Sequence, residues 1–231
     1  MSDLVNFFSD NASLLFNKAV ATMGIAALAI AIALLVALPT GVWLGHRHAG
    51  SFLAINISNA FRALPSLALI AISLALLGLS LINIQVALIA LALPPILTNA
   101  YTAVDGVDPD AVDAARGMGM RELQVLTGVE LPLSWPLIFA GIRTASVYVI
   151  ATTPLAALAG GGGLGDIIVN QPTYKLVGVI AATIVVVVLA FVVDGLLGLV
   201  QRAVTPRGLV LPKELHAIVP ATDTTATTTA A

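Results

Sequence analysis

The sequence predicts an all-α integral membrane protein with about five transmembrane helices. Three observations lead to this prediction. Hydrophobic residues make up 59% of the 231 residues and charged residues only 10%, whereas a soluble domain is typically about 25% charged. The apolar residues form long runs, and a transmembrane helix needs about 20 of them in succession. A single polar stretch, Asp113–Pro132, separates the third of these runs from the fourth and predicts a helix–turn–helix loop.

The apolar runs give approximate limits for the spans. The polar residues Ser80, Asn83 and Gln85 divide one run that is too long for a single helix. The expected spans lie near residues 18–44, 53–79, 86–104, 133–158 and 176–200.

The distribution of basic residues predicts the orientation, because cytoplasmic loops carry an excess of lysine and arginine. An external N-terminus leaves only Lys18 and Lys175 outside. We therefore expect an external segment 1–17, a transmembrane domain 18–205 and a cytoplasmic tail 206–231, which is of low complexity and expected to be disordered. The residues then placed inside are His46, Arg47, His48, Arg116, Arg121, Arg202, Arg207 and Lys213.

Residues that favour the beginning or the end of a helix are frequent in the polar loop, residues 108–132. Asp108 is a good N-cap and Pro109 suits a first helical turn, while Gly117 or Gly119 can supply a left-handed stop. A second short helix is expected over residues 120–127, ended by Gly128.

This elbow has a predicted surface of small residues, Ala114, Ala115 and Gly119, which would permit another backbone to approach closely. Composition and capping alone leave two alternatives open, an ordinary helical loop and a docking site.

The spacing of residues in the loop resembles a known family motif. Asp113-Ala114-Ala115, three residues, Gly119, nine residues and then Val129-Glu130-Leu131-Pro132 is similar to the E-A-A-x3-G-x9-I-x-L-P motif of ABC-importer permeases. Aspartate replaces glutamate and valine replaces isoleucine. The resemblance implies that the loop forms coupling helices that dock in a groove of a cytoplasmic ATPase. It assigns this role to Asp113, Ala114, Ala115, Gly119 and Val129, with Leu131 and Pro132 at the junction to the next span.

The resemblance extends over about residues 18–205. The segments FRALPSLALIAI, LPPILTNAYTAVDGVDP and AGIRTASVYVIATTPLAALAGGGGLGD are similar to the osmoprotectant branch of these permeases. That branch handles glycine betaine, choline, carnitine and proline. The implied fold is that of a type I ABC-importer permease.

The same resemblance implies a non-catalytic pore subunit without a cofactor or metal, in the plasma (inner) membrane of a prokaryote. The implied partners are an ATPase dimer, a second permease chain, an extracellular or periplasmic solute-binding protein and membrane lipid, with no nucleic acid. Three alternatives stay open: a stand-alone secondary transporter or channel, an ABC permease for another small solute such as an amino acid, and a structural membrane-assembly subunit.

A glycine pattern and a histidine pattern can each be interpreted either as a functional site or as a structural feature. Gly160–Gly165 matches G-x-G-x-x-G but follows a membrane helix, so a nucleotide site is disfavoured. We expect an external loop here, either plain or part of an outer gate at Gly162 and Gly163. His46 and His48 favour a cytoplasmic anchor over a metal site, since two histidines alone seldom bind metal.

Three ionisable residues, Arg62, Arg143 and Asp194, lie within predicted spans. Such residues are costly in a membrane. We hypothesise a structural ion pair between Asp194 and one of the arginines, and the alternative is that the arginines snorkel to the interface without partners.

Prolines also interrupt the predicted spans, at Pro65 and at Pro94-Pro95. Helix kinks beside Ser66, Asn99 and Tyr101 predict a polar path, with ordinary kinked packing as the alternative. The pair Gly41 and Gly45, spaced as G-x-x-x-G, favours helix packing over dimerisation.

Overall fold

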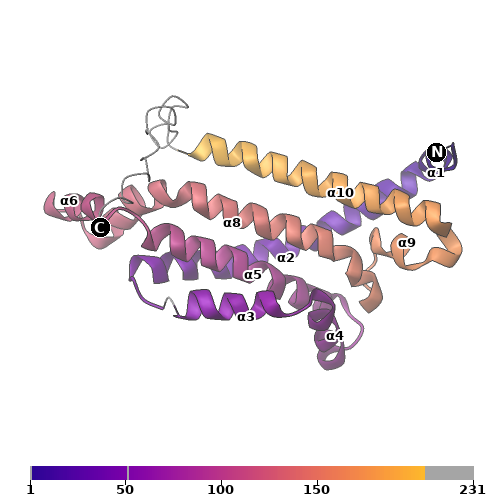
Figure 1. The fold of residues 1–231 in the computed structure, drawn as a ribbon, viewed down its shortest axis with the longest axis horizontal. Helices are drawn as coiled ribbons and strands as arrows, with labels where there is room; N and C mark the ends of the chain where they lie inside the picture. Colours follow the sequence, from indigo (N-terminus) through magenta and orange to yellow (C-terminus); the bar gives the residue numbers. More distant parts are fainter. Residues whose placement is uncertain (1, 51, 206–231) are drawn as a thin grey trace, which may run out of the picture.

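A computed structural model of the chain describes residues 2–50 and 52–205, and all regular structure in these ranges is helical. Helix α2 packs on α5, α5 on α8 and α8 on α10 (Figure 1). The predicted tail 206–231 lies outside the described residues. In chain order the elements are α1 (Ser2–Asp10), α2 (Ala12–His46), a π-helix η1 (Phe52–Ile57), α3 (Ser58–Ala63), α4 (Ser66–Leu77), α5 (Leu81–Asp105), α6 (Pro109–Gly117), α7 (Glu122–Val125), a π-helix η2 (Leu126–Glu130), α8 (Leu131–Thr152), a 3₁₀ helix η3 (Thr153–Ala159), α9 (Gly165–Val169) and α10 (Gln171–Val204).

Four helical segments of the described chain are long and apolar enough to cross a membrane. They are α2, α5, the continuous run Glu122–Ala159 that contains α8, and α10. In Figure 1, α6 lies at one end of these long helices, and α1 and α9 lie at the other. The prediction of an all-α membrane fold is confirmed, although the described residues contain four such helices where five were expected.

The predicted second span, residues 53–79, accounts for this difference. It is divided into η1, α3 and α4. Proline has no backbone N–H, and its ring disfavours a helical conformation in the preceding residue, so α3 ends two residues before Pro65 and α4 begins directly after it. Gly78 then ends α4, and Ser80 caps α5 by accepting a hydrogen bond from the Asn83 N–H at 3.3 Å.

One predicted helix boundary is wrong. Gly128 does not end a helix, because a left-handed stop requires positive φ and Gly128 is not among the positive-φ glycines of the described chain. The helix instead passes from α7 through η2 into α8. At the other end of the chain, the predicted segment 1–17 contains α1 and the first turns of α2, since the first long helix already begins at Ala12.

Small residues allow α2 to lie close to α5. A Cβ atom added to Gly41 would lie 2.7 Å from the Ala100 Cβ atom, and one added to Gly45 would lie 2.8 Å from the Tyr101 carbonyl oxygen. The G-x-x-x-G pair therefore packs two helices of the same chain together. The buried alanines of α2 that continue this contact stripe are Ala26, Ala29, Ala33 and Ala37.

Candidate functional site

The elbow between α5 and α8 begins and turns where local capping chemistry predicts. The Asp108 carboxylate accepts a hydrogen bond from the Asp110 N–H at 3.0 Å, with Pro109 in the first turn of α6. At the other end of α6, Gly119 has a φ of +85°. Its N–H donates to the Arg116 carbonyl oxygen at 2.9 Å, while the Met120 N–H donates to the Ala115 carbonyl oxygen at 3.2 Å. This pair of hydrogen bonds is a Schellman motif, which needs a left-handed residue and so favours glycine.

The elbow has a small apolar core of its own. Its buried members are Val107, Val112, Ala115 and Val125, with Met120 and Val129 packed against them. Ala115 is only 1% exposed, so the predicted small-residue surface is wrong at this position. Helical periodicity explains this outcome, because Ala115 lies three residues after Val112 and shares its inward face.

The outer face of the elbow is open. Ala114 and Gly119 are exposed, and a Cβ atom added to Gly119 would meet nothing within 4 Å. Two large apolar side chains, Met118 and Leu123, are 77% and 70% exposed beside them. This mixture of small and apolar residues on a rigid two-helix projection is suited to contact with another protein.

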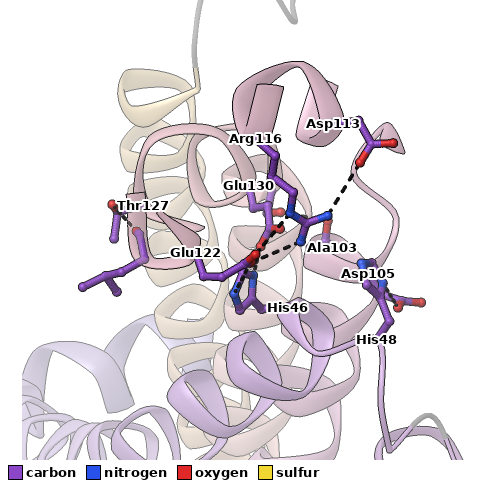
Figure 2. Close-up of polar contacts among 11 residues, drawn as sticks. His46, His48, Ala103, Asp105, Asp113, Arg116, Glu122, Thr127 and Glu130 are labelled. Carbon is purple, nitrogen blue, oxygen red and sulfur yellow. Dashed lines mark hydrogen bonds and ion pairs between the residues drawn. The ribbon is translucent and has the colours of Figure 1, made fainter. Parts of the chain in front are cut away.

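Arg116 and Glu122 connect the two short helices of the elbow. The Arg116 Nε and Nη2 atoms donate to the two oxygens of the Glu122 carboxylate at 3.3 and 3.2 Å (Figure 2). Arg116 also lies 3.6 Å from a carboxylate oxygen of Asp113. The hydrogen bond from Arg116 lowers the pKa of Glu122, and the hydrogen bond to Glu122 raises the pKa of Arg116.

His46, the last residue of α2, lies against two carboxylates of the elbow. Its Nδ1 atom is 2.7 Å from Oε2 of Glu130, and its Nε2 atom is 3.6 Å from Oε2 of Glu122. Figure 2 shows the imidazole beside both carboxylates. The Glu130 side chain is 2% exposed and the His46 side chain 11% exposed, so this contact is enclosed.

Nearby contacts join α2 and α8 to the end of α5. His48 pairs with Asp105 at 2.9 Å, and both side chains are partly exposed. The Ser134 hydroxyl donates to the Ala103 carbonyl oxygen at 2.8 Å. The motif residues Leu131 and Pro132 form the first turn of α8, close in sequence to this serine. The junction between elbow and membrane helix is therefore fixed from two neighbouring helices.

The residues proposed for a polar path do not gather at one place. Pro65 and Ser66 stand at the break between α3 and α4. The Asn99 side chain donates to the Pro95 carbonyl oxygen at 2.7 Å and lies against Gly141 of α8. Tyr101, which is 3% exposed, lies against the glycines of α2.

The glycine-rich loop after η3 is packed against α2 at the end of the molecule opposite the elbow. Thr22 accepts a hydrogen bond from the Leu164 N–H at 2.9 Å through its hydroxyl oxygen. A Cβ atom added to Gly163, whose φ is +80°, would lie 2.6 Å from that oxygen. The Lys18 ammonium pairs with Asp166 just beyond the loop, and Gly162 also has a positive φ of +73°.

Arg143 of α8 and Asp194 of α10 form a bidentate ion pair. The Arg143 Nε and Nη2 atoms donate to the two Asp194 oxygens at 2.9 and 2.7 Å, and Nη1 donates to Gln201 at 3.1 Å. Gln201 in turn donates to the Pro136 carbonyl oxygen at 2.8 Å. Arg62 belongs to α3, and its side chain lies outside the part of the chain that the structure describes.

Sequence reasoning assigned no role to Glu130, and it treated His46 as a charged anchor. A signal was available for Glu130, which is an acid that directly precedes an apolar helix and therefore needs a partner. Its partner was not identifiable, since His46 lies 84 positions away. Across the described residues, no group of three or more His, Cys, Asp or Glu side chains is arranged to hold a metal ion.

The fold is a bundle of long apolar helices with a polar two-helix elbow at one end. It defines the chain as a membrane protein whose elbow is suited to contact a partner outside the membrane. The chain belongs to the family described as the binding-protein-dependent transport system inner membrane component, whose family model matches residues 37–206. The predicted resemblance to ABC-importer permeases is thus confirmed.

Three individual relatives are similar to this chain over most of its length. The choline transport system permease protein OpuBB of Bacillus subtilis is 38% identical over 93% of this chain and 100% of its own length. The carnitine transport permease protein OpuCB of Listeria monocytogenes is 36% identical, covering 90% of this chain and 96% of the relative. The osmoprotectant import permease protein OsmW of Salmonella typhimurium is 32% identical over 90% and 99% of the two chains.

Solved structures agree with the fold. The MetNI methionine ABC transporter, in inward-facing conformations, matches with a TM-score of 0.70 at 22% identity, covering 84% of this chain and 98% of the other. An amino acid ABC transporter matches with a TM-score of 0.61 at 17% identity, over 84% and 96% of the two chains. The predicted importer-permease fold is confirmed by these matches.

Proposed function

We propose that this chain is the permease subunit of an ATP-binding-cassette importer for compatible solutes of the glycine betaine, choline, carnitine and proline type. The observation that carries the proposal is the elbow, where the spaced family motif coincides with an open projection that carries exposed apolar side chains. The solute class is supported by relatives whose names specify choline and carnitine.

The elbow faces the cytoplasm, with the N-terminus outside, the C-terminus inside and the chain in the plasma (inner) membrane of a prokaryote. Basic residues support this orientation, because Arg47, Arg116 and Arg121 lie in or next to the elbow. Lys18 lies at the opposite end, where it pairs with Asp166.

A separate ATPase dimer docks on the elbow. The sequence contains no G-x4-G-K-[ST] motif, so ATP hydrolysis belongs to the partner and this chain is the non-catalytic pore subunit. The exposed side chains of Ala114, Met118 and Leu123 provide the apolar contact, and Gly119 allows the ATPase backbone to approach. When the ATPases close on ATP, two elbows are drawn together and the pore opens outward; hydrolysis resets it.

The pore is built with a second permease chain, identical or homologous, and an external binding protein delivers the solute. The exposed apolar side chains of the long helices contact membrane lipid or the second chain. Pro65, Ser66, Asn99 and Tyr101 remain candidates for the pore, and Gly162 and Gly163 for an outer gate. The Arg143–Asp194 pair has a structural role, because it joins α8 to α10 through two hydrogen bonds.

Uptake by the whole complex tests the proposal. Vesicles that contain the permease with its co-purifying ATPase, and with binding protein outside, are expected to accumulate labelled betaine, choline, carnitine or proline only with ATP inside. Gly119→Arg is expected to abolish uptake by blocking docking. Gly119→Ala is the matched control, since it introduces the same backbone strain with a single methyl group in open space. Uptake without ATP, or no ATPase in the purified complex, would show a secondary transporter or channel instead.

A further inference from the structure

His46 joins the elbow to α2 by a contact that docking of an ATPase does not require. The two carboxylates on its ring come from different elements, Glu130 from η2 and Glu122 from α7. Figure 2 shows all three side chains on the side of the elbow that faces the bundle. Neither His46 nor Glu122 belongs to the family motif, and Glu130 occupies its unspecified position.

Each ring nitrogen of His46 faces one carboxylate of the elbow. The Nδ1 atom lies 2.7 Å from Oε2 of Glu130, and the Nε2 atom lies 3.6 Å from Oε2 of Glu122. Because the Glu130 side chain is almost fully buried, it needs a hydrogen-bonding partner more than an exposed acid does. His46 is the residue that meets this need from α2.

Other charged groups surround this contact without replacing it. Arg116 of α6 donates to both oxygens of Glu122, including the Oε2 atom that lies 3.6 Å from His46. Arg47, the next residue after His46, acts on Glu122 electrostatically. The third histidine–acid contact, His48 with Asp105 of α5, is more exposed, with side chains 56% and 35% accessible. Of the acids that contact a histidine in the described chain, only Glu130 is buried.

We propose that His46 is a positioning residue that fastens the coupling elbow to α2, so that movement of the elbow is passed to this helix through the contact between His46 and Glu130. The proposal rests on the proposed function, because it takes the elbow as the site of ATPase docking. Helix α2 extends from this contact to the Lys18–Asp166 pair, about 40 Å away at about 1.5 Å per residue. Displacement of the elbow would thus reach the far end of the bundle through one continuous helix.

The test compares His46→Gln, Glu130→Gln, the double variant and His46→Lys in the reconstituted complex. The measured quantity is the amount of solute transported per ATP hydrolysed. Each single glutamine variant is expected to lower this ratio about tenfold, in the range of a typical coupling between two sites. The double variant is expected to be no worse than either single one, because the two residues act through one contact.

Rescue by a basic side chain separates positioning from a general structural role. His46→Lys keeps a donor for the Glu130 carboxylate and is expected to restore part of the ratio that His46→Gln loses. His48→Gln is the matched control, since it removes a histidine–acid contact two residues away, and its ratio is expected to match that of the unsubstituted protein.

Hydrogen–deuterium exchange of residues 109–130 in the purified complex gives a readout that does not depend on the solute. Faster exchange in His46→Gln, with unchanged exchange in His48→Gln, supports the fastening even if no tested solute is transported, in which case the proposed function alone fails. If His46→Gln keeps both the transport ratio and the exchange rates of the unsubstituted protein, the role of His46 is refuted.

Discussion

The two ends of α2 are attached to their neighbours by different means. At the elbow end, His46 lies between two carboxylates, one of them 2% exposed. At the opposite end, Thr22 accepts a backbone hydrogen bond from Leu164, and Gly163 lies against the same threonine. The Lys18–Asp166 ion pair at this second end is partly exposed, at 30% and 36%.

This difference predicts two kinds of sensitivity. The elbow end depends on charge, so neutralising a side chain or changing the pH should loosen it. The glycine-loop end depends on close backbone approach, which protonation does not alter, so added side-chain volume should disrupt it instead. Substitutions of each kind at both ends test the comparison, and their expected effects decrease from the buried acid to the exposed pairs.

Removing the buried acid should have the largest effect. We expect Glu130→Ala to lower the free energy of unfolding of the purified permease by about 4 kcal/mol, because it leaves a cavity where a buried side chain was and removes the hydrogen-bonding partner of the His46 Nδ1 atom. The matched control is Asp105→Ala, which removes the acid from the more exposed His48 contact and should cost at most about 1 kcal/mol. Denaturation by SDS measures both. Equal losses would show that burial does not distinguish the two histidine–acid contacts.

Adding a methyl group to a glycine should destabilise the glycine-loop end more than the elbow end. Gly163 and Gly119 have φ values of +80° and +85°, so alanine is strained at both by about 1 kcal/mol. At Gly163 the new Cβ atom would also lie 2.6 Å from the Thr22 oxygen, whereas at Gly119 it meets nothing within 4 Å. We expect Gly163→Ala to cost about 3 kcal/mol in total. Similar losses in the same SDS measurement would mean that only the backbone conformation matters.

The features that sequence predicted well are those that a few adjacent residues determine. The N-cap Asp108 and the left-handed Gly119 bound α6 as expected, because both act on hydrogen bonds within one turn. Pro65 was expected to kink a span, but it divides the span into separate helices. Gly128 failed as a stop because glycine permits a left-handed conformation without imposing it.

The polar contacts of the site could not be predicted from residues that are neighbours in the sequence. The histidine and its buried acid are 84 positions apart, and Lys18 and Asp166 are 148 apart, so only the packed fold brings them together. Ala115 is a second example of what sequence does not predict. The motif identified this residue, but only the packing of the elbow shows that it faces inward. Sequence therefore located the elbow and its family, and the structure added what attaches the elbow to the bundle.

The exposed pair at the glycine-loop end should contribute little. We expect Lys18→Met to lower the free energy of unfolding by at most about 1 kcal/mol, with the difference disappearing in high salt, because exposed ion pairs are weak and screened. SDS denaturation at low and high salt measures this, and Ser9→Ala, at an exposed position of α1, controls for substitution near the same end. A salt-independent loss well above that value would show that charge also holds the glycine loop.

The smallest expected effect is a loss of stability of the elbow at low pH. The pKa of Glu122 is lowered, chiefly by its hydrogen bond with Arg116, so the folded elbow favours the ionised acid. The stability from this contact is present above the ordinary pKa of glutamate and is lost as the pH falls through the lowered value.

Exchange of the elbow amides, corrected for intrinsic exchange, should therefore become faster as the pH falls through the lowered pKa of Glu122. Glu122→Gln should remove this dependence, because glutamine does not titrate. Hydrogen–deuterium exchange across a series of pH values measures it. An increase at low pH that persists in Glu122→Gln would assign it to another carboxylate and show that the Arg116–Glu122 contact is not its source. The glycine loop, held by backbone contacts, should show no such increase.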